Sequence, residues 1–187
     1  MNTKTEELTE AQIVEAAQVG RLESFAALYQ RYYSPMAALA YSILADSHLA
    51  EDAAQETFAI ACRDLRSLKN KEKFAAWLAG ICRNTARQMQ RDKAKVIPLN
   101  EAAANSSNMD TTLELDSIRQ AVWKLRACDR ELIILRYYDN LPYDRIASVL
   151  AISPQAVNGR LIRAKRKIEK FLKHNGFTGG DYEHARK

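Results

Sequence analysis

A basic segment in the C-terminal third of the chain carries the side chains with the clearest binding chemistry. From Ser153 to Lys173 the sequence has seven Lys and Arg residues and one acidic residue, Glu169, which gives a local formal charge of +6. Lys and Arg neutralise phosphates and displace the counterions condensed on nucleic acid. A helix of ordinary width also fits the major groove of DNA and brings polar side chains to base edges. The segment therefore predicts binding to duplex DNA.

The sequence also predicts that this segment is a helix. Ser153 suits the N-cap position, because its hydroxyl can accept a bond from a first-turn amide, and Pro154 suits the first helical position. Apolar residues from Val157 and Leu161 onward repeat at helical spacing, so one stripe is buried and the basic remainder is exposed. A basic helix can also be merely a solvated surface. A preceding helix from Leu141 to Leu150 completes a helix-turn-helix, which favours DNA binding.

Residues of this second helix fall into two expected groups. Its N-terminal part should approach base edges, and its later basic residues should meet phosphates. Gln155, Asn158 and Arg163 are the candidates for base contacts. The whole predicted duplex-DNA site comprises Ser153, Gln155, Asn158, Gly159, Arg160, Ile162, Arg163, Arg166 and Lys167.

The composition of the chain fits a helical protein of one or two domains. It has 187 residues, 47% of them hydrophobic, and a net charge of +5 that lies mostly in its second half. Gly and Pro are scarce, and apolar residues recur at helical rather than strand spacing. The polar start of the chain and the lack of an 18-residue apolar run predict neither a secretory signal nor a membrane span. We therefore expect a cytoplasmic, all-α protein.

A first helical domain is predicted over residues 8–95. Two apolar helical stripes flank Pro35, a third helix begins near Asp46 and runs to Leu65, and a fourth runs from Phe74 past Arg91. These four helices are expected to form one bundle.

A second domain follows a break in the pattern. Residues 96–112 lack a burying periodicity and are rich in small polar residues, which predicts a flexible linker. Helical stripes resume over residues 113–174, where one helix begins with an acidic cap at Asp129 and the helix-turn-helix completes the domain. Residues 175–187 are expected to form a flexible tail.

The first domain contains two further candidate surfaces. Asp52 and Glu56 lie one turn apart on one helix face, where they suit docking against a basic surface, although carboxylates can also simply solvate a helix. The loop before Phe74 and the helix after it combine basic and aromatic residues, which can stack and track single-stranded nucleic acid. Trp77 and Phe74 are individually favoured as core residues. The predicted single-strand site comprises Lys69, Asn70, Lys71, Lys73, Trp77, Arg83, Asn84 and Arg87.

Together these segments resemble bacterial sigma factors of the extracytoplasmic-function (ECF) type, group 4 of the sigma-70 family. Residues 50–58 are similar to the acidic polymerase-contacting helix of that family, and residues 74–84 to its promoter-opening segment. Residues 129–137 and 143–168 are similar to its minus-35 helix-turn-helix. Asn158 and Gly159 stand where family members often carry a basic residue and Ser, which leaves open the base sequence read there.

The resemblance implies a function. Such a chain binds core RNA polymerase and directs promoter-specific initiation, reading minus-35 duplex DNA with its helix-turn-helix and melting and reading the minus-10 element with its N-terminal domain. The implied partners are the clamp of the largest polymerase subunit, the polymerase flap, promoter DNA and an anti-sigma factor, which could hold the chain at the membrane. No catalytic residue, metal, cofactor or membrane insertion is implied. The implied polymerase-binding residues are Asp52, Gln55, Glu56 and Phe58.

Two other classes of function compete with this interpretation. An enzyme is disfavoured because no Gly-rich phosphate loop is present and the three His residues are scattered. A conventional regulator would bind duplex DNA unaided as a dimer and would use residues 1–95 for sensing or pairing, whereas a sigma factor needs core polymerase. The default for Cys62, Cys82 and Cys128 is a buried thiol, with redox sensing as the alternative.

Overall fold

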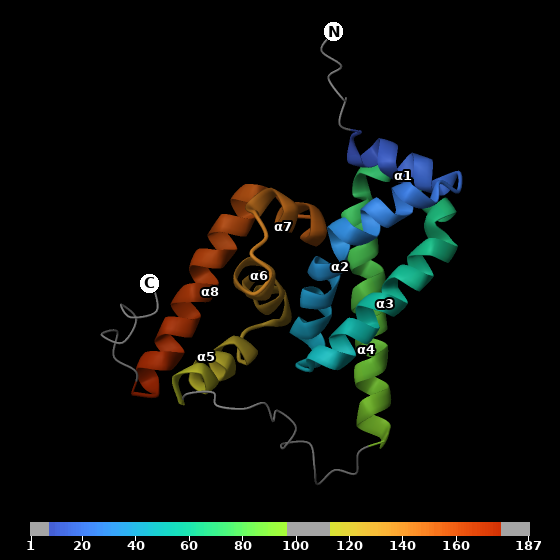
Figure 1. Ribbon diagram of the computed structural model, residues 1–187. Helices are drawn as coiled ribbons and strands as arrows, with labels where there is room; N and C mark the ends of the chain where they lie inside the picture. Colours follow the sequence, from blue (N-terminus) through green and yellow to red (C-terminus); the bar gives the residue numbers. More distant parts are fainter. Residues whose placement is uncertain (1–7, 97–112, 177–187) are drawn as a thin grey trace.

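The computed structural model describes residues 8–96 and 113–176 (Figure 1). All regular structure in these two ranges is helical, which confirms the predicted all-α class. The α-helices are α1 (Glu10–Gln18), α2 (Leu22–Leu44), α3 (Ser47–Asp64), α4 (Phe74–Val96), α5 (Leu113–Trp123), α6 (Ala127–Tyr137), α7 (Tyr143–Leu150) and α8 (Pro154–His174), and two short 3-10 helices, η1 (Leu65–Ser67) and η2 (Lys71–Lys73), lie between α3 and α4.

The first domain is built on α2, α3 and α4, with α1 across one end (Figure 1). Its core includes Leu28, Met36, Leu39 and Leu78, none of which is exposed. Helix α2 passes without interruption through Pro35, so the expectation of two separate helices there was wrong. Proline removes one amide donor. The helix nevertheless continues, because residues on both sides of Pro35 are buried in the same core.

Helix α1 was not predicted as a separate element. It begins with a capping box in which the Thr9 hydroxyl accepts from the Gln12 amide and the Gln12 side chain accepts from the Thr9 amide. This arrangement satisfies two amides that would otherwise lack partners. Ile13 and Val14 then bury the inner face of the helix.

The N-cap predicted at Ser153 is confirmed and a helix begins at Asp46 as expected, whereas the acidic cap predicted at Asp129 is wrong, because the N-cap of α6 is Arg126. Asp46 accepts from the Leu49 amide at 3.2 Å, and Ser153 accepts from the Ala156 amide at 3.1 Å with Pro154 at the first helical position. Helix α6 begins at Ala127 rather than at the predicted Asp129, which lies in the first turn. The predicted linker beyond Val96 and the tail beyond residue 176 lie outside the described residues.

The two domains pack against each other along a contact that we call the domain seam, formed by α6 and α7 against α2 and α4 (Figure 1). Tyr41 of α2 stacks on Tyr138 with ring centroids 5.4 Å apart and packs against Trp123 at 5.7 Å. Arg130 of α6 donates to the Ser42 carbonyl at 2.7 Å. Aromatic rings with polar ends therefore make much of this contact.

Charged side chains form a second part of the domain seam. Arg145 of α7 lies 3.3 Å from a Glu10 carboxylate oxygen, with its guanidinium 5.1 Å from the centroid of the Tyr32 ring. The Tyr32 hydroxyl donates to Glu10. Burial, together with this hydrogen bond, raises the pKa of Tyr32 above its ordinary value, so the hydroxyl remains a donor.

Asp139 is the least satisfied group at the domain seam. One of its oxygens accepts from the Ser34 hydroxyl, and the other is buried with no hydrogen-bond partner among the described residues. Burial raises the pKa of the Asp139 carboxyl, although the bond from Ser34 opposes that shift. An ionised carboxylate at this place therefore weakens the folded protein.

Replacing Asp139 with Asn should raise the melting temperature at pH 7.5. Because the pKa of Asp139 is raised in the folded state, its ionisation penalty is present above that pKa and fades as the pH falls toward the unfolded-state value, about 4. The gain should therefore shrink between pH 7.5 and pH 4, as scanning calorimetry can measure. The matched control is Asp144→Asn, since Asp144 is exposed. A gain that does not depend on pH would contradict this explanation.

Candidate nucleic-acid interface

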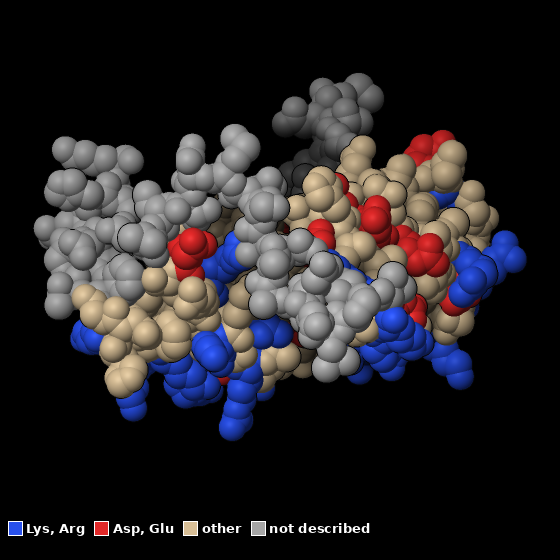
Figure 2. Space-filling view, turned by 90° about the horizontal axis from the view of Figure 1, so that it is seen from below, with Lys and Arg blue, Asp and Glu red and all other residues tan. Residues whose placement is uncertain are grey.

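Helix α8 has one buried face and one outward face. The buried face, which packs on the other helices of the second domain, consists of Val157, Leu161, Ala164 and Leu172. In Figure 2, Lys and Arg side chains gather along the lower edge of both halves of the molecule. The exposed residues of the predicted duplex-DNA site are Ser153, Gln155, Asn158, Ile162, Arg163, Arg166 and Lys167, whereas Gly159 and Arg160 are half-buried.

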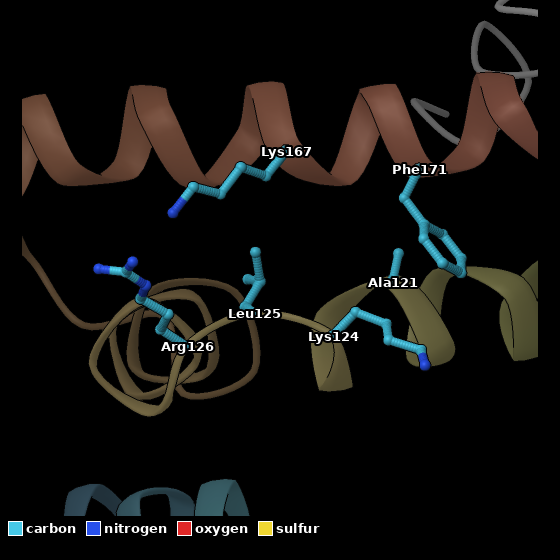
Figure 3. A pocket seen from close by; sticks show the side chains of 6 residues that line it. All are labelled: Ala121, Lys124, Leu125, Arg126, Lys167 and Phe171. Carbon is cyan, nitrogen blue, oxygen red and sulfur yellow. The ribbon is translucent and has the colours of Figure 1, made fainter.

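Lys167 points away from the rest of the predicted site. Its ammonium donates to the Asp129 carboxylate of α6 at 2.6 Å. Figure 3 shows the side chain reaching from α8 toward Leu125 and Arg126. Arg163 and Arg166 remain on the exposed side of the helix. The structure therefore leaves Arg163 and Arg166 on the exposed side and engages the exposed Lys167 in an ion pair with Asp129.

The basic loop before α4 is held by contacts within the first domain. Lys69, Asn70 and Lys73 are exposed. The Asn70 side chain accepts from the Glu72 amide at 3.1 Å and caps η2, which fixes the shape of the loop. Lys71 pairs with Glu15 of α1 at 2.6 Å.

The predicted residues of α4 are placed differently from one another. Asn84 and Arg87 are exposed, whereas Trp77 is half-buried and packs against Phe74 at a centroid distance of 5.9 Å, as its alternative role in the core predicted. Arg83 is bound at the domain seam. Its Nε and Nη2 donate to the Glu131 carboxylate at 3.1 and 3.0 Å, and the two side chains are only 21% and 9% exposed.

A cleft brings the two candidate DNA surfaces together at one end of the domain seam. It has a volume of about 630 Å³ and is lined by Lys73 and Ala76 of the first domain and by Ser148, Ser153 and Pro154 of the second. The start of α8 therefore faces the loop that precedes α4. Each surface limits access to the other.

The acidic surface lies on α3. Asp52, Gln55 and Glu56 are exposed, and Asp and Glu side chains gather in the right half of the view in Figure 2. Phe58 is 3% exposed and packs against Phe25 and Tyr29, with its ring centroid 4.7 Å from that of Tyr29. Phe58 therefore supports this surface from beneath.

A basic pocket between α5 and α8 was not predicted from the sequence. It has a volume of about 320 Å³. Phe171 of α8 points toward α5, and Lys124, Arg126 and Lys167 supply three cations around apolar walls (Figure 3). The sequence signal for this pocket was the pair of cations, Lys124 and Arg126, on either side of Leu125, where the apolar stripe ends. Their convergence with Phe171 depends on how α5 packs on α8.

Other site chemistries are not evident in the described ranges. No group of three or more His, Cys, Asp or Glu residues there could hold a metal ion, and no helix there is long and apolar enough to cross a membrane. Cys82 is buried, and burial raises the pKa of its thiol to about 12, so it is a poor nucleophile. Cys62 and Cys128 are exposed, contrary to the default expectation for both.

Comparisons with known proteins match both domains. A family model described as sigma-70 region 2 matches residues 28–96, and one described as sigma-70, region 4 matches residues 115–168. RNA polymerase sigma factor YlaC of Bacillus subtilis is 29% identical over 160 residues, which cover 79% of this chain and 91% of that protein. ECF RNA polymerase sigma factor SigW of the same organism is 28% identical over 171 residues, covering 82% and 91%. The structure of CnrH in complex with the cytosolic domain of CnrY matches with a TM-score of 0.60 and 26% identity, covering 89% of this chain and 98% of that one.

Replacing Glu131 with Gln should open the domain seam. In the closed arrangement of this variant, the Arg83 guanidinium would be largely buried with no carboxylate partner. Breaking a fully buried pair costs about 3–5 kcal/mol, and partial exposure of Arg83 reduces our expectation to about 1–3 kcal/mol. Small-angle X-ray scattering should show a larger radius of gyration. Glu169→Gln is the control, because it breaks an exposed pair with Lys173, and equal radii for both variants would count against the role of Arg83.

Proposed function

This chain belongs to the sigma-70 family of RNA polymerase sigma factors, in its ECF type, and we propose how its residues divide the work of promoter recognition. As a sigma factor it is not an enzyme, and it directs RNA polymerase to promoters through regions 2 and 4. The observation that carries the proposal is the outward basic face of α8 in a chain whose other domain carries an exposed acidic helix. The exposed residues of these two surfaces do not pack in the hydrophobic core of the protein.

We propose that α8 reads the minus-35 element in the major groove. Gln155, Asn158 and Arg163 would reach base edges from its exposed side, while Arg160 and Arg166 would position the helix on phosphates. Ser153 contributes by capping the helix, because its hydroxyl accepts from the Ala156 amide and so fixes the start of α8. Lys167 takes part only if it leaves Asp129.

We propose that the loop before α4 and the exposed face of α4 read the minus-10 element. Lys69, Asn70 and Lys73 would track the separated strand, and Asn84 and Arg87 would follow it along the helix. Lys71 and Arg83 could join them only after they leave Glu15 and Glu131. Trp77 supports this surface from the core and, through its exposed edge, offers a place for a base to stack.

The closed domain seam is incompatible with reading both elements at once. The two elements lie about 25 base pairs apart, which corresponds to about 85 Å along B-DNA. In the closed arrangement Lys73 and Ser153 line a single cleft. We therefore propose that the domains separate on the polymerase and that separation releases Arg83 for DNA.

Two surfaces are proposed to bind the polymerase. The exposed carboxylates of α3, Asp52 and Glu56, would dock with Gln55 on the clamp of the largest subunit, where charge complementarity fixes orientation and speeds encounter. Phe58 would keep that helix in place. The basic pocket around Phe171 is proposed as the contact with the flap, because its apolar walls can bury a side chain of the partner.

An inhibitory partner is proposed from a relative. CnrH was solved with the cytosolic domain of CnrY and matches this chain across both domains. We propose that an anti-sigma factor binds this chain and favours the closed domain seam. The chain would then work in the cytoplasm, or wait at the membrane when its inhibitor is anchored there, until a stress signal releases it.

In vitro transcription tests the proposed function. The purified chain with core polymerase should give discrete start sites on a genomic fragment library, and the chain alone should not bind those fragments specifically. Asp52→Lys combined with Glu56→Lys should reduce core binding at least tenfold, because both contacts become repulsive. Glu23→Lys is the control on an exposed position of α2. Specific duplex binding without polymerase would instead indicate a conventional regulator.

Arg166 and Lys167 should differ in their effect on promoter binding. Arg166→Ala in the holoenzyme should weaken binding to all promoters about equally and reduce the slope of log affinity against log salt by about 0.9, the value for one lost phosphate contact. Lys167→Ala should leave the slope unchanged, because Lys167 is paired with Asp129. Filter-binding titrations over a range of salt concentrations measure both slopes. Equal slopes for the two variants would contradict the assignment.

A further inference from the structure

Helix α8 has an unusual feature in its N-terminal half, the gap that the missing side chain of Gly159 leaves beside Arg163, which we call the notch. We propose that the notch lets the Arg163 guanidinium lie along the helix and bind a guanine in the minus-35 element, while Ile162 packs on the methyl group of a neighbouring thymine. This inference rests on the proposed role of α8 at that element. It assigns base chemistry to positions whose reading the sequence leaves open.

Nothing in the described part of the chain requires glycine at position 159. The residue lies inside a 21-residue helix, and its φ is not in the left-handed region. A Cβ atom built there would meet one neighbour within 4 Å, the Arg163 Nη1 at 3.5 Å, which is ordinary contact with the end of a flexible side chain. Glycine inside a helix is less stable than alanine by about 1 kcal/mol. A reason for keeping it must therefore lie outside the chain, on the exposed side.

Arg163 already occupies the notch in the free protein. Side chains on a helix lean toward its N-terminus, and Arg163 follows Gly159 by one turn. Its guanidinium consequently lies beside position 159, with Nη1 3.5 Å from a Cβ atom built there. A longer side chain at 159 would lift the guanidinium off the helix. Lying flat, it is presented in the N-terminal half of α8, where recognition helices contact bases, and the fork geometry of Arg matches O6 and N7 of guanine.

Ile162 adds an apolar group to the same face. It is 44% exposed and lies one turn from Asn158 and one turn from Arg166. A single exposed apolar residue is common on protein surfaces. Here it lies on a surface that is otherwise basic and polar, directly beside Arg163 in sequence. Apolar side chains recognise the C5 methyl of thymine, the one apolar group in the major groove. Ile162 and Arg163 would therefore read neighbouring bases.

The chain offers a matched control in Gly80. This glycine also lies inside a long helix, α4, and a Cβ built there would meet nothing within 4 Å. The same substitution at both positions therefore makes a comparable change in helix propensity. Only position 159 lies on the proposed minus-35 face, so only substitution there should change base reading.

The experiment uses the full chain with core polymerase. Transcription selection over a randomised promoter library gives the preferred upstream motif, and synthetic promoters then carry either 7-deazaguanine, which lacks N7, or uracil, which lacks the methyl group, at single positions. One 7-deazaguanine should reduce affinity about 5- to 10-fold and one neighbouring uracil about 3- to 5-fold. Arg163→Ala should abolish the first effect alone, and Ile162→Ala the second alone.

Gly159→Leu tests the notch itself. This variant should melt no lower than the wild type but should lose the response to 7-deazaguanine, whereas Gly80→Leu should keep it. If Gly159→Leu retains both the motif and the response, the notch has no role and the inference is overturned. If the selection returns no upstream motif even for the wild type, the proposed minus-35 role fails as well, so the two failures are distinguishable.

Discussion

The buried ion pair between Arg83 and Glu131 is the interaction on which the closed arrangement of the two domains depends. A guanidinium at that depth must have a carboxylate partner, because desolvating an unpaired charge costs several kcal/mol. The pair joins α4, a proposed DNA-reading helix, to α6 of the other domain. DNA phosphate and Glu131 offer Arg83 the same chemistry. If Arg83 binds DNA as proposed, the domain seam competes with the promoter for this one side chain.

The charge distribution follows from the same need to bind two large partners. An acidic face on α3 suits a basic protein surface, and a basic face on α8 suits phosphates. The cores of both domains are formed by apolar stripes on other faces of the helices, so these charged faces are not needed for packing. Lys167 and Phe58 show the limit of this division, because Lys167 is paired with Asp129 of its own domain and Phe58 is buried in the core.

Local patterns predicted the elements and many of the exposed residues. The caps at Asp46 and Ser153 and the stripe from Val157 depend on neighbours within a few turns, so sequence spacing reveals them. Helix α1 was missed because the apolar residues in a nine-residue segment are too few to show a helical spacing. Its stability comes from packing on α2. The continuity of α2 through Pro35 likewise depends on tertiary burial that outweighs a lost amide.

The pairs that connect distant residues could not be predicted. Arg83 and Glu131 are 48 residues apart, and each looks like an ordinary surface charge in its own segment. The same holds for Lys167 with Asp129, and for Phe171 with the cations of the basic pocket. Only the folded geometry decides which of several similar cations is already neutralised. A DNA-binding site predicted from residue types alone therefore includes cations that are already paired within the protein.

The makeup of the domain seam has a consequence for repeated use of the protein. Tyr41, Tyr138 and Trp123 are rings with a polar end, and hydrogen bonds and ion pairs lie beside them, although apolar residues of the two domains also join in one core. The aromatic and charged parts of the domain seam tolerate water, so they can be hydrated when the domains separate. Under the proposed function, the same polar contacts can form again when the protein leaves the polymerase and its domains come back together.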